Sequence, residues 1–180
     1  NSNNEIFIVS DNGEIWCFKQ QNWIKIESLV SEDLNDIVFE GERGLISGSS
    51  GLILGSENNG ETWEIRETPE EVSNSNIISI GFYGMNRGYA ITSDGQILKS
   101  TQEALTTTVG YYWYLKEIES ENMSTTLGIN LTSIEVLSTT KILLSGENGY
   151  IALSKDGGNI VGPQLLPIEG DFTINDIAMK

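Results

Sequence analysis

The sequence contains no histidine and a single cysteine, Cys17, and these two absences remove several kinds of chemistry. Histidine is the commonest general base and the commonest zinc ligand in proteins, so neither a histidine-dependent active site nor a typical zinc site is expected. One cysteine cannot form a disulfide within the chain. Without a histidine to activate it, Cys17 is expected to be a small buried hydrophobic residue rather than a nucleophile. We therefore expect no enzyme activity, no cofactor and no metal.

Basic residues are also scarce, with 10 lysines and arginines against 26 acidic residues and a net charge of −16. Such a surface repels phosphate backbones and anionic membranes unless its basic residues gather in one patch. Isolated lysines, such as Lys99 and Lys141, form no such patch. The composition therefore argues against nucleic acid as a partner and favours another protein with a basic surface.

Long hydrophobic runs are absent too. No segment approaches the ~20 apolar residues that a membrane-spanning helix needs, so direct membrane insertion is not expected. The chain starts at Asn1 without a signal sequence, which favours a processed mature form or a piece of a longer protein. The compartment stays unassigned, with an exported or extracellular location favoured over a cytoplasmic one.

What the sequence does contain is a fourfold repeat. Each copy has a glycine preceded by a turn-forming residue (Asn, Ser or Asp), and an isoleucine two residues later. The glycines are 38, 44 and 54 residues apart, at Gly13, Gly51, Gly95 and Gly149. The isoleucines are Ile15, Ile53, Ile97 and Ile151. A two-residue turn of the Asn-Gly type needs positive φ, and side chains alternate along the strand that leaves it. Each copy is therefore predicted to be a tight β-hairpin that points its isoleucine to a fixed face.

Short apolar strands are predicted on both sides of these hairpins. They lie at 35–39, 78–82 and 132–136 upstream, and at 23–26, 62–65, 113–116 and 161–166 downstream. Four short antiparallel strands in a unit of ~40–50 residues are the strand number and repeat length of a propeller blade. The predicted blade units are about 1–30, 31–68, 74–120 and 128–168, with long surface loops at 101–111 and 119–130.

The two ends of the sequence indicate how such a ring would close. The first unit begins directly at its second strand, whereas residues 173–178 repeat the first-strand pattern Asn35-Asp36-Ile37. A closing strand at 171–180 that completes the first blade would remove two free sheet edges. We therefore expect residues 1–180 to form one all-β domain, a β-propeller of about four blades with four strands each. The alternative is an arc of a larger propeller.

The segment Ser56-Glu57-Asn58-Asn59-Gly60-Glu61-Thr62-Trp63 resembles the Asp-box of the BNR repeat, with Asn58 in place of the aspartate. The fourth unit keeps part of this box, at Asp156 and Gly158. Together with the hairpins, the pattern is similar to propellers of the photosystem II assembly and stability factor type. In that family the box is a structural turn between the third and fourth strands of a blade. The resemblance thus implies structural roles for Ser56, Asn58, Gly60 and Trp63.

Sialidases share the Asp-box, so they are the enzymes to weigh against a binding protein. They resemble this chain in repeat architecture, but they use a six-bladed ring, an arginine triad and a tyrosine–glutamate nucleophile pair. The chain is too short for that ring, and its arginines, Arg43, Arg66 and Arg87, lie in different contexts. A degenerate sialidase-like glycosidase therefore remains only a remote alternative.

The strongest candidate binding feature is the aromatic run Tyr111, Tyr112, Trp113 and Tyr114. Alternation places Tyr112 and Tyr114 on one face of a strand and the other two on the opposite face. Aromatic side chains with polar tips suit protein interfaces and also stack on sugars. The leading interpretation is a non-catalytic scaffold for protein–protein interaction or complex assembly. The alternative is a glycan-binding propeller, exported to a cell surface or carried on a virion.

Overall fold

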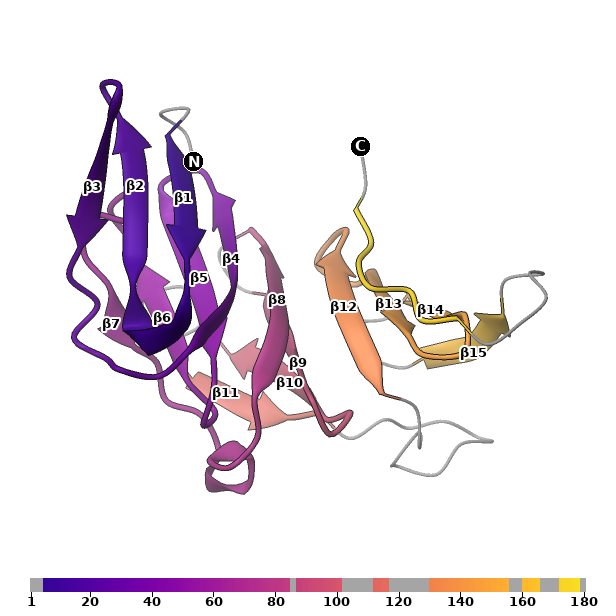
Figure 1. The fold of residues 1–180 in the computed structure, drawn as a ribbon. Helices are drawn as coiled ribbons and strands as arrows, with labels where there is room; N and C mark the ends of the chain where they lie inside the picture. Colours follow the sequence, from indigo (N-terminus) through magenta and orange to yellow (C-terminus); the bar gives the residue numbers. More distant parts are fainter. Residues whose placement is uncertain are drawn as a thin grey trace.

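The computed structural model describes residues 5–84, 87–101, 112–116, 130–155, 160–165 and 172–178. Within these ranges the chain forms four antiparallel sheets that follow one another along an arc (Figure 1). The first sheet holds β1 (Ile6–Val9), β2 (Ile15–Lys19) and β3 (Asn22–Ile26). The second holds β4 (Leu34–Glu40), β5 (Arg43–Gly48), β6 (Ile53–Ser56) and β7 (Glu64–Ile65).

The third and fourth sheets repeat the four-stranded order of the second. The third holds β8 (Ile77–Tyr83), β9 (Arg87–Thr92), β10 (Ile97–Thr101) and β11 (Tyr112–Leu115). The fourth holds β12 (Leu131–Val136), β13 (Ile142–Gly146), β14 (Tyr150–Ser154) and β15 (Ile160–Leu165). Two one-turn 3-10 helices, η1 (Asp11–Gly13) and η2 (Glu70–Val72), complete the regular structure of the described residues. No helix among these residues has the length and apolar character that a membrane crossing requires. The predicted all-β fold of antiparallel four-stranded blades is confirmed.

The four repeat glycines all lie at turns with positive φ, between 67° at Gly149 and 82° at Gly95. At Gly13, Gly51 and Gly149, the segment that leads into the following unit packs directly on the turn. A Cβ added to Gly51 would lie 2.7 Å from the carbonyl oxygen of Val72, and one added to Gly149 would lie 2.6 Å from the Phe172 ring. Glycine is therefore needed at these positions both for the turn and for the close approach of the next unit.

The core is divided into three layers, each between two successive sheets. Ile15 of the first sheet packs with Leu54 and Trp63 of the second. Leu45 and Ile53 of the second sheet join a cluster with Ala90, Leu98 and Trp113 of the third. A third cluster combines Tyr89 and Ile97 of the third sheet with Leu144 and Ala152 of the fourth. Each sheet thus uses one face against the sheet before it and the other face against the sheet after it.

A belt of polar contacts joins the first strands of the second, third and fourth sheets. The Asp36 carboxylate accepts hydrogen bonds from the Ser79 hydroxyl at 3.1 Å and from the Ile80 amide at 2.9 Å. The Ser79 oxygen in turn accepts the Ile134 amide at 3.3 Å. These bonds cross from one sheet to the next, so they fix the spacing of the strands that line the inside of the arc.

The C-terminal segment corrects one part of the fold prediction. Residues 172–178 were expected to complete the first blade, but they form no strand and lie against the fourth sheet. The Asp176 carboxylate accepts the Ser133 hydroxyl at 2.7 Å, and the Ile174 amide donates to the Gly146 carbonyl at 3.1 Å. The first sheet accordingly has three strands, and the described residues form an open arc rather than a closed ring (Figure 1).

Three tryptophans at equivalent positions allow the layered core to be tested. Trp23 and Trp113 lie opposite Phe18 and Ser100 in the outer strands of their sheets, and Trp63 directly precedes the outer strand β7. Trp63 and Trp113 are 4% and 5% exposed, whereas Trp23 is 48% exposed. We expect Trp63→Ala and Trp113→Ala each to lower the free energy of unfolding by about 3–5 kcal/mol. Trp23→Ala should lower it by less than about 1 kcal/mol in dilute solution. Urea unfolding measures all three, and equal losses would contradict the layered arrangement.

The position of Glu135 near Asp36, a residue of the polar belt, predicts a pH-dependent effect on the stability of the fold. Burial raises the pKa of the Glu135 carboxyl above its ordinary value, and the nearby Asp176 and Asp36 raise it further. The folded state therefore holds this proton more tightly than the unfolded state, so the charged form weakens the fold as pH rises through the folded pKa. We expect Glu135→Gln to raise the urea midpoint at pH 7 and to leave it unchanged at a pH below both pKa values. The control Glu71→Gln, at an exposed side chain of η2, should change neither midpoint, and a Glu135→Gln gain that persisted in acid would refute the charge explanation.

Candidate functional site

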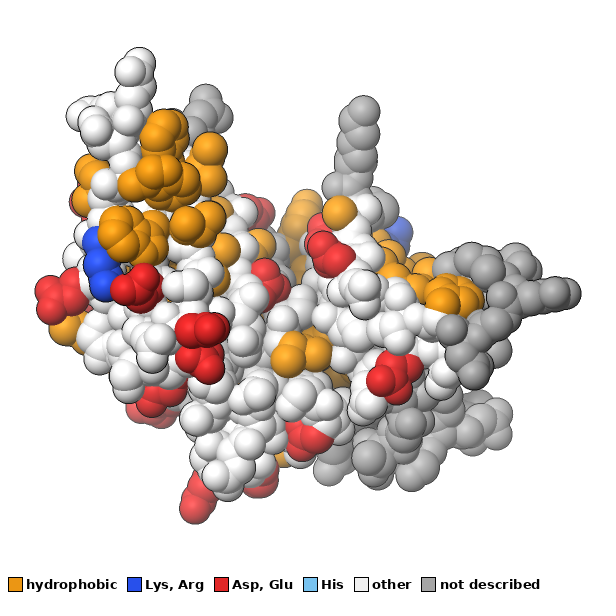
Figure 2. Space-filling model, viewed as in Figure 1, with side chains coloured by type: hydrophobic (Ala, Val, Ile, Leu, Met, Phe, Trp, Pro, Cys, Tyr) orange, Lys and Arg blue, Asp and Glu red, His pale blue; other side chains and the backbone are white. Residues whose placement is uncertain are grey.

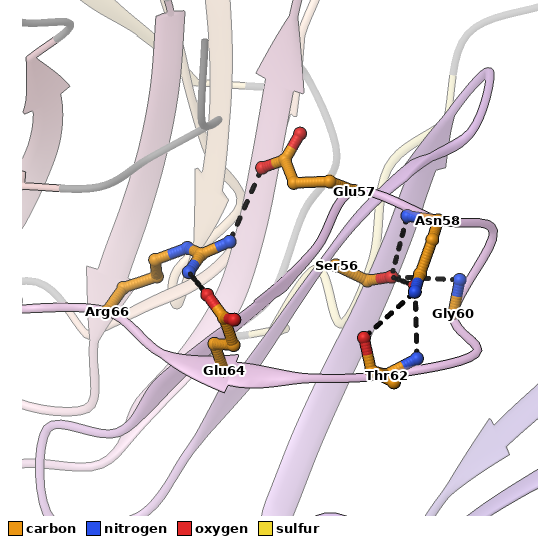
Figure 3. A network of polar contacts seen from close by, with 7 residues as sticks. All are labelled: Ser56, Glu57, Asn58, Gly60, Thr62, Glu64 and Arg66. Atoms are coloured by element: carbon orange, nitrogen blue, oxygen red, sulfur yellow. Dashed lines mark hydrogen bonds and ion pairs between the residues drawn. The ribbon is translucent and has the colours of Figure 1, made fainter. Parts of the chain in front are cut away.

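The Asp-box residues of the second unit bond to one another (Figure 3). The Ser56 hydroxyl oxygen accepts the Gly60 amide at 2.9 Å and donates to Asn58 Oδ1 at 3.0 Å. Asn58 Oδ1 also accepts the Thr62 amide at 3.0 Å, and Asn58 Nδ2 donates to Thr62 Oγ1 at 2.9 Å. The Trp63 indole N–H donates to the Gly60 carbonyl at 3.1 Å. These side chains hold a turn between β6 and β7, and this geometry is that of a structural element. Asp156 and Gly158 of the fourth unit lie outside the described residues.

A buried arginine sits beside this turn. The Arg66 side chain is 1% exposed and lies over Gly55, where an added Cβ would be 2.3 Å from Arg66 Nε. Its guanidinium contacts Glu57 at 3.3 Å and Glu64 at 3.2 Å (Figure 3). The Glu64 side chain is 77% exposed and that of Glu57 is 36% exposed. The positive charge is therefore hidden in the protein, while the two negative charges that compensate it face solvent.

These residues line a cavity of about 230 Å³. It is lined by one glycine and five residues with polar or charged side chains: Gly55, Glu57, Asn58, Thr62, Glu64 and Arg66. Two carboxylates against one guanidinium leave a net negative charge at this place. The cavity thus suits a cationic group better than an anionic or apolar one.

The predicted aromatic patch adjoins the same part of the second sheet. Glu67, one residue after Arg66, pairs with Tyr112 in a parallel bridge, and its carbonyl accepts the Trp113 amide at 3.0 Å. Tyr112 is half-buried, Trp113 is 5% exposed and Tyr114 is 38% exposed. Trp113 therefore belongs to the core, and Tyr112 and Tyr114 reach the surface. Tyr111 lies outside the described residues.

We call the outer edge of the second and third sheets that carries Glu57, Glu64, Tyr112 and Tyr114 the acidic rim. The two tyrosines lie on the face of β11 opposite to Trp113 and do not line the cavity. Sequence reasoning found the two tyrosines but missed the carboxylates and the buried Arg66. The available signal was an arginine directly after the alternating strand 63–65, together with the small residue Gly55 on the neighbouring strand. That signal is weak, because the pairing of Gly55 with Glu64 across β6 and β7 is visible only in the structure.

Two titratable side chains near the N-terminal end of the described residues, Cys17 and Glu14, have shifted pKa values. Burial raises the pKa of the Cys17 thiol, and the neighbouring Glu5 raises it further, so the reactive thiolate is disfavoured. Among the described residues, no three His, Cys, Asp or Glu side chains come together as a metal site. Glu14, which lies beside the Lys25 ammonium at 2.7 Å, has a lowered pKa mainly because of that contact, and this pair is exposed at the surface.

Comparison with known proteins identifies the family. The sequence profile described as "Photosynthesis system II assembly factor YCF48" matches residues 1–101, which is more than half of the chain. A rice protein (Oryza sativa subsp. japonica), the chloroplastic photosystem II stability/assembly factor HCF136, is 36% identical over 53 residues. That match spans 29% of this chain and 12% of the rice protein.

Solved structures show the same architecture. YCF48 from Cyanidioschyzon merolae superposes with a TM-score of 0.58 at 23% identity, covering 74% of this chain and 39% of that one. An ancestral GH74 enzyme gives a TM-score of 0.60 at 18% identity, covering 89% of this chain and 23% of that one. At these identities the likenesses establish the propeller fold alone, and this chain spans well under two thirds of the length of each relative. Because the profile match covers residues 1–101, more than half of the chain, the chain belongs to the Photosynthesis system II assembly factor YCF48 family.

Proposed function

We propose that this chain is a non-catalytic scaffold that binds a basic segment of a partner protein at the acidic rim during the assembly of a larger complex. Membership of an assembly factor family supports the scaffold role. The observation that carries the choice of site is Arg66, whose buried guanidinium holds Glu57 and Glu64 in place while their charge remains at the surface. The rim is thus a fixed negative surface, prepared before any partner arrives.

The chemistry of the rim defines the partner. Lysine and arginine side chains complement the two carboxylates, and an arginine also stacks on a tyrosine face. The chain as a whole carries a net charge of −16, so long-range attraction favours the same class of partner. Acidic side chains recur across the face of the molecule drawn in Figure 2. A basic peptide segment is therefore the ligand that both the local and the overall charge favour.

Several observations support a scaffold over an enzyme. The chain contains no histidine. The two carboxylates that line the cavity are both paired with Arg66, so they compensate a buried positive charge. The likeness to a GH74 enzyme extends to fold only, at 18% identity. A glycan-binding role would rest on stacking aromatics, and of the described patch residues Trp113 is in the core.

The test is the affinity for a lysine-rich peptide, measured by titration calorimetry with a glutamate-rich peptide of equal length for comparison. We expect the lysine-rich peptide alone to bind, and more weakly as salt increases. The double variant Glu64→Gln with Tyr114→Ala should bind about tenfold more weakly, because it removes one charged contact and one aromatic contact worth about 0.5–1 kcal/mol each.

The matched control is Glu71→Gln with Tyr83→Ala, which makes the same changes in charge and ring number at exposed positions away from the rim. It should retain the affinity of the unmodified chain. Equal loss in both variants would show that only net charge is sensed, and binding of the glutamate-rich peptide would refute the basic partner.

A further inference from the structure

The connection between β3 and β4 (Figure 1) holds a leucine in a backbone conformation that leucine rarely adopts. Leu29 has a φ of 63°, in the left-handed region that is strained for a bulky side chain. The other described non-glycine residues with positive φ are all polar: Asn12, Gln20, Gln21, Ser50, Asn59 and Asn148. Leu29 is therefore the one hydrophobic residue among the described positions of this kind.

The residues on either side of Leu29 impose this conformation. The Ser28 hydroxyl accepts the Val30 amide and donates to the Val30 carbonyl, each at 3.4 Å, so the chain bends tightly around Leu29. Ser28 is buried, and Val30 packs against the core layer between the first two sheets. The Val30 carbonyl also lies against Gly13, where an added Cβ would clash with it. Because both neighbours are fixed to the fold, the backbone of Leu29 is held in place.

The fold gains no burial in return for this strain, because the Leu29 side chain is 81% exposed. This exposure does not come from an uncovered end of the arc, since the connection joins the first sheet to the second. The second unit shows the same arrangement with a sheet on each side: the Val72 carbonyl lies against Gly51, and the preceding Glu71 is exposed. Leucine at position 29 is thus favoured neither by the backbone nor by burial within the chain. A strained residue of this kind points to a role in recognition.

Leu29 borders a pocket of about 270 Å³. Ile26 and Val30 also line it with apolar side chains, and Lys25 and Glu27 line it with charged ones. An apolar side chain that entered this pocket would be removed from water against Ile26 and Val30 and would cover Leu29. The pocket therefore suits the insertion of one apolar side chain of a partner.

The charges near the pocket indicate which residues would surround that inserted side chain. Lys25 is already paired with Glu14 at 2.7 Å. Glu27 lines the pocket, and Asp33 accepts the amide of Asn12, another lining residue, at 3.0 Å. These groups leave a surplus of negative charge, as does the chain as a whole with its net charge of −16. Lysine or arginine beside the inserted side chain is the combination that this charge favours.

We propose that Leu29 and this pocket form a second contact point for a partner protein, which inserts an apolar side chain flanked by lysine or arginine. The strained turn holds Leu29 in its binding position beforehand, so little conformational freedom is lost when the partner binds. Glu57 and Glu64 of the acidic rim do not line the pocket. The contact at Leu29 is therefore separate from the rim and does not depend on it.

Two lysine-rich peptides of equal length and charge test the proposal, one with a central pair of leucines and the other with two serines there. Fluorescence anisotropy of the labelled peptides gives both affinities. The unmodified chain should bind the leucine peptide at least about tenfold more tightly, because the apolar contact adds to the charge attraction. This ratio should persist at high salt, which weakens the binding of both peptides. Equal affinity for the two peptides would overturn the proposal.

Leu29→Asn should have opposite effects on binding and on stability. It should remove the preference for the leucine peptide, and it should raise the urea midpoint, because asparagine tolerates positive φ better than leucine does. A gain in stability with a loss of binding marks a residue kept for recognition. A lowered midpoint, or an unchanged preference, would contradict the assignment. Leu29→Met keeps an apolar side chain and should keep the preference, as should Tyr83→Asn at a 44% exposed side chain outside the pocket.

The rim variant Glu64→Gln with Tyr114→Ala separates this contact from the proposed function. It should weaken both peptides and leave the ratio of their affinities unchanged. A variant that bound both peptides as before would count against the rim alone, whereas loss of the ratio would place the leucine at the rim and overturn the role of Leu29. Sedimentation velocity provides the last check: self-association that Leu29→Asn abolished would make a second copy the occupant and would also overturn the proposal.

Discussion

The structure depends on one contact that is made three times, the packing of one sheet face on the next. Each layer brings together the isoleucine after a turn glycine and the apolar side chains of the following sheet, as Ile15 does with Leu54 and Trp63. Close packing in these layers requires small residues at fixed points. Trp63 lies over Gly44 and Trp113 over Gly88, where an added Cβ would come within 2.8 Å and 2.7 Å of the ring. Because every blade packs on its neighbours with both faces, the apolar side chains between blades are covered, whereas the outer faces of the first and last blades of an array stay uncovered.

The acidic rim follows from this arrangement. The rim is formed where outer strands leave the layered core, so polar side chains there can serve recognition without disturbing the packing. Arg66 couples the two requirements, because its buried guanidinium fills the space over Gly55 and also orders two carboxylates at the surface. Membership of an assembly factor family agrees with a molecule whose distinctive residues position a charged surface rather than catalytic groups.

Much of the fold could be predicted from the sequence because its determinants are local. Turn glycines and alternating strands specify hairpins without reference to the rest of the chain, and the four units emerged with strands close to those expected. Alternation showed that Trp113 and Tyr114 lie on opposite faces, but only the neighbouring sheet decides which face is covered. The prediction that residues 172–178 complete the first blade failed for a related reason. Ring closure depends on the angle accumulated over all the sheets, and the sequence of one segment does not reveal that angle. The burial of Arg66 depends on a cross-strand neighbour, which single-sequence patterns do not reveal.

Amide hydrogen exchange on the dilute protein tests the central claim most directly, because it reports local opening strand by strand. An open arc held together by sheet-on-sheet layers predicts the greatest protection in β5 and β9, which have a covered sheet on both sides. It predicts the least protection in β1 and in residues 172–178, which lie at the uncovered ends. Protection of β1 equal to that of β5 in dilute solution would contradict this account, because it would mean that the two ends are already covered within a single chain.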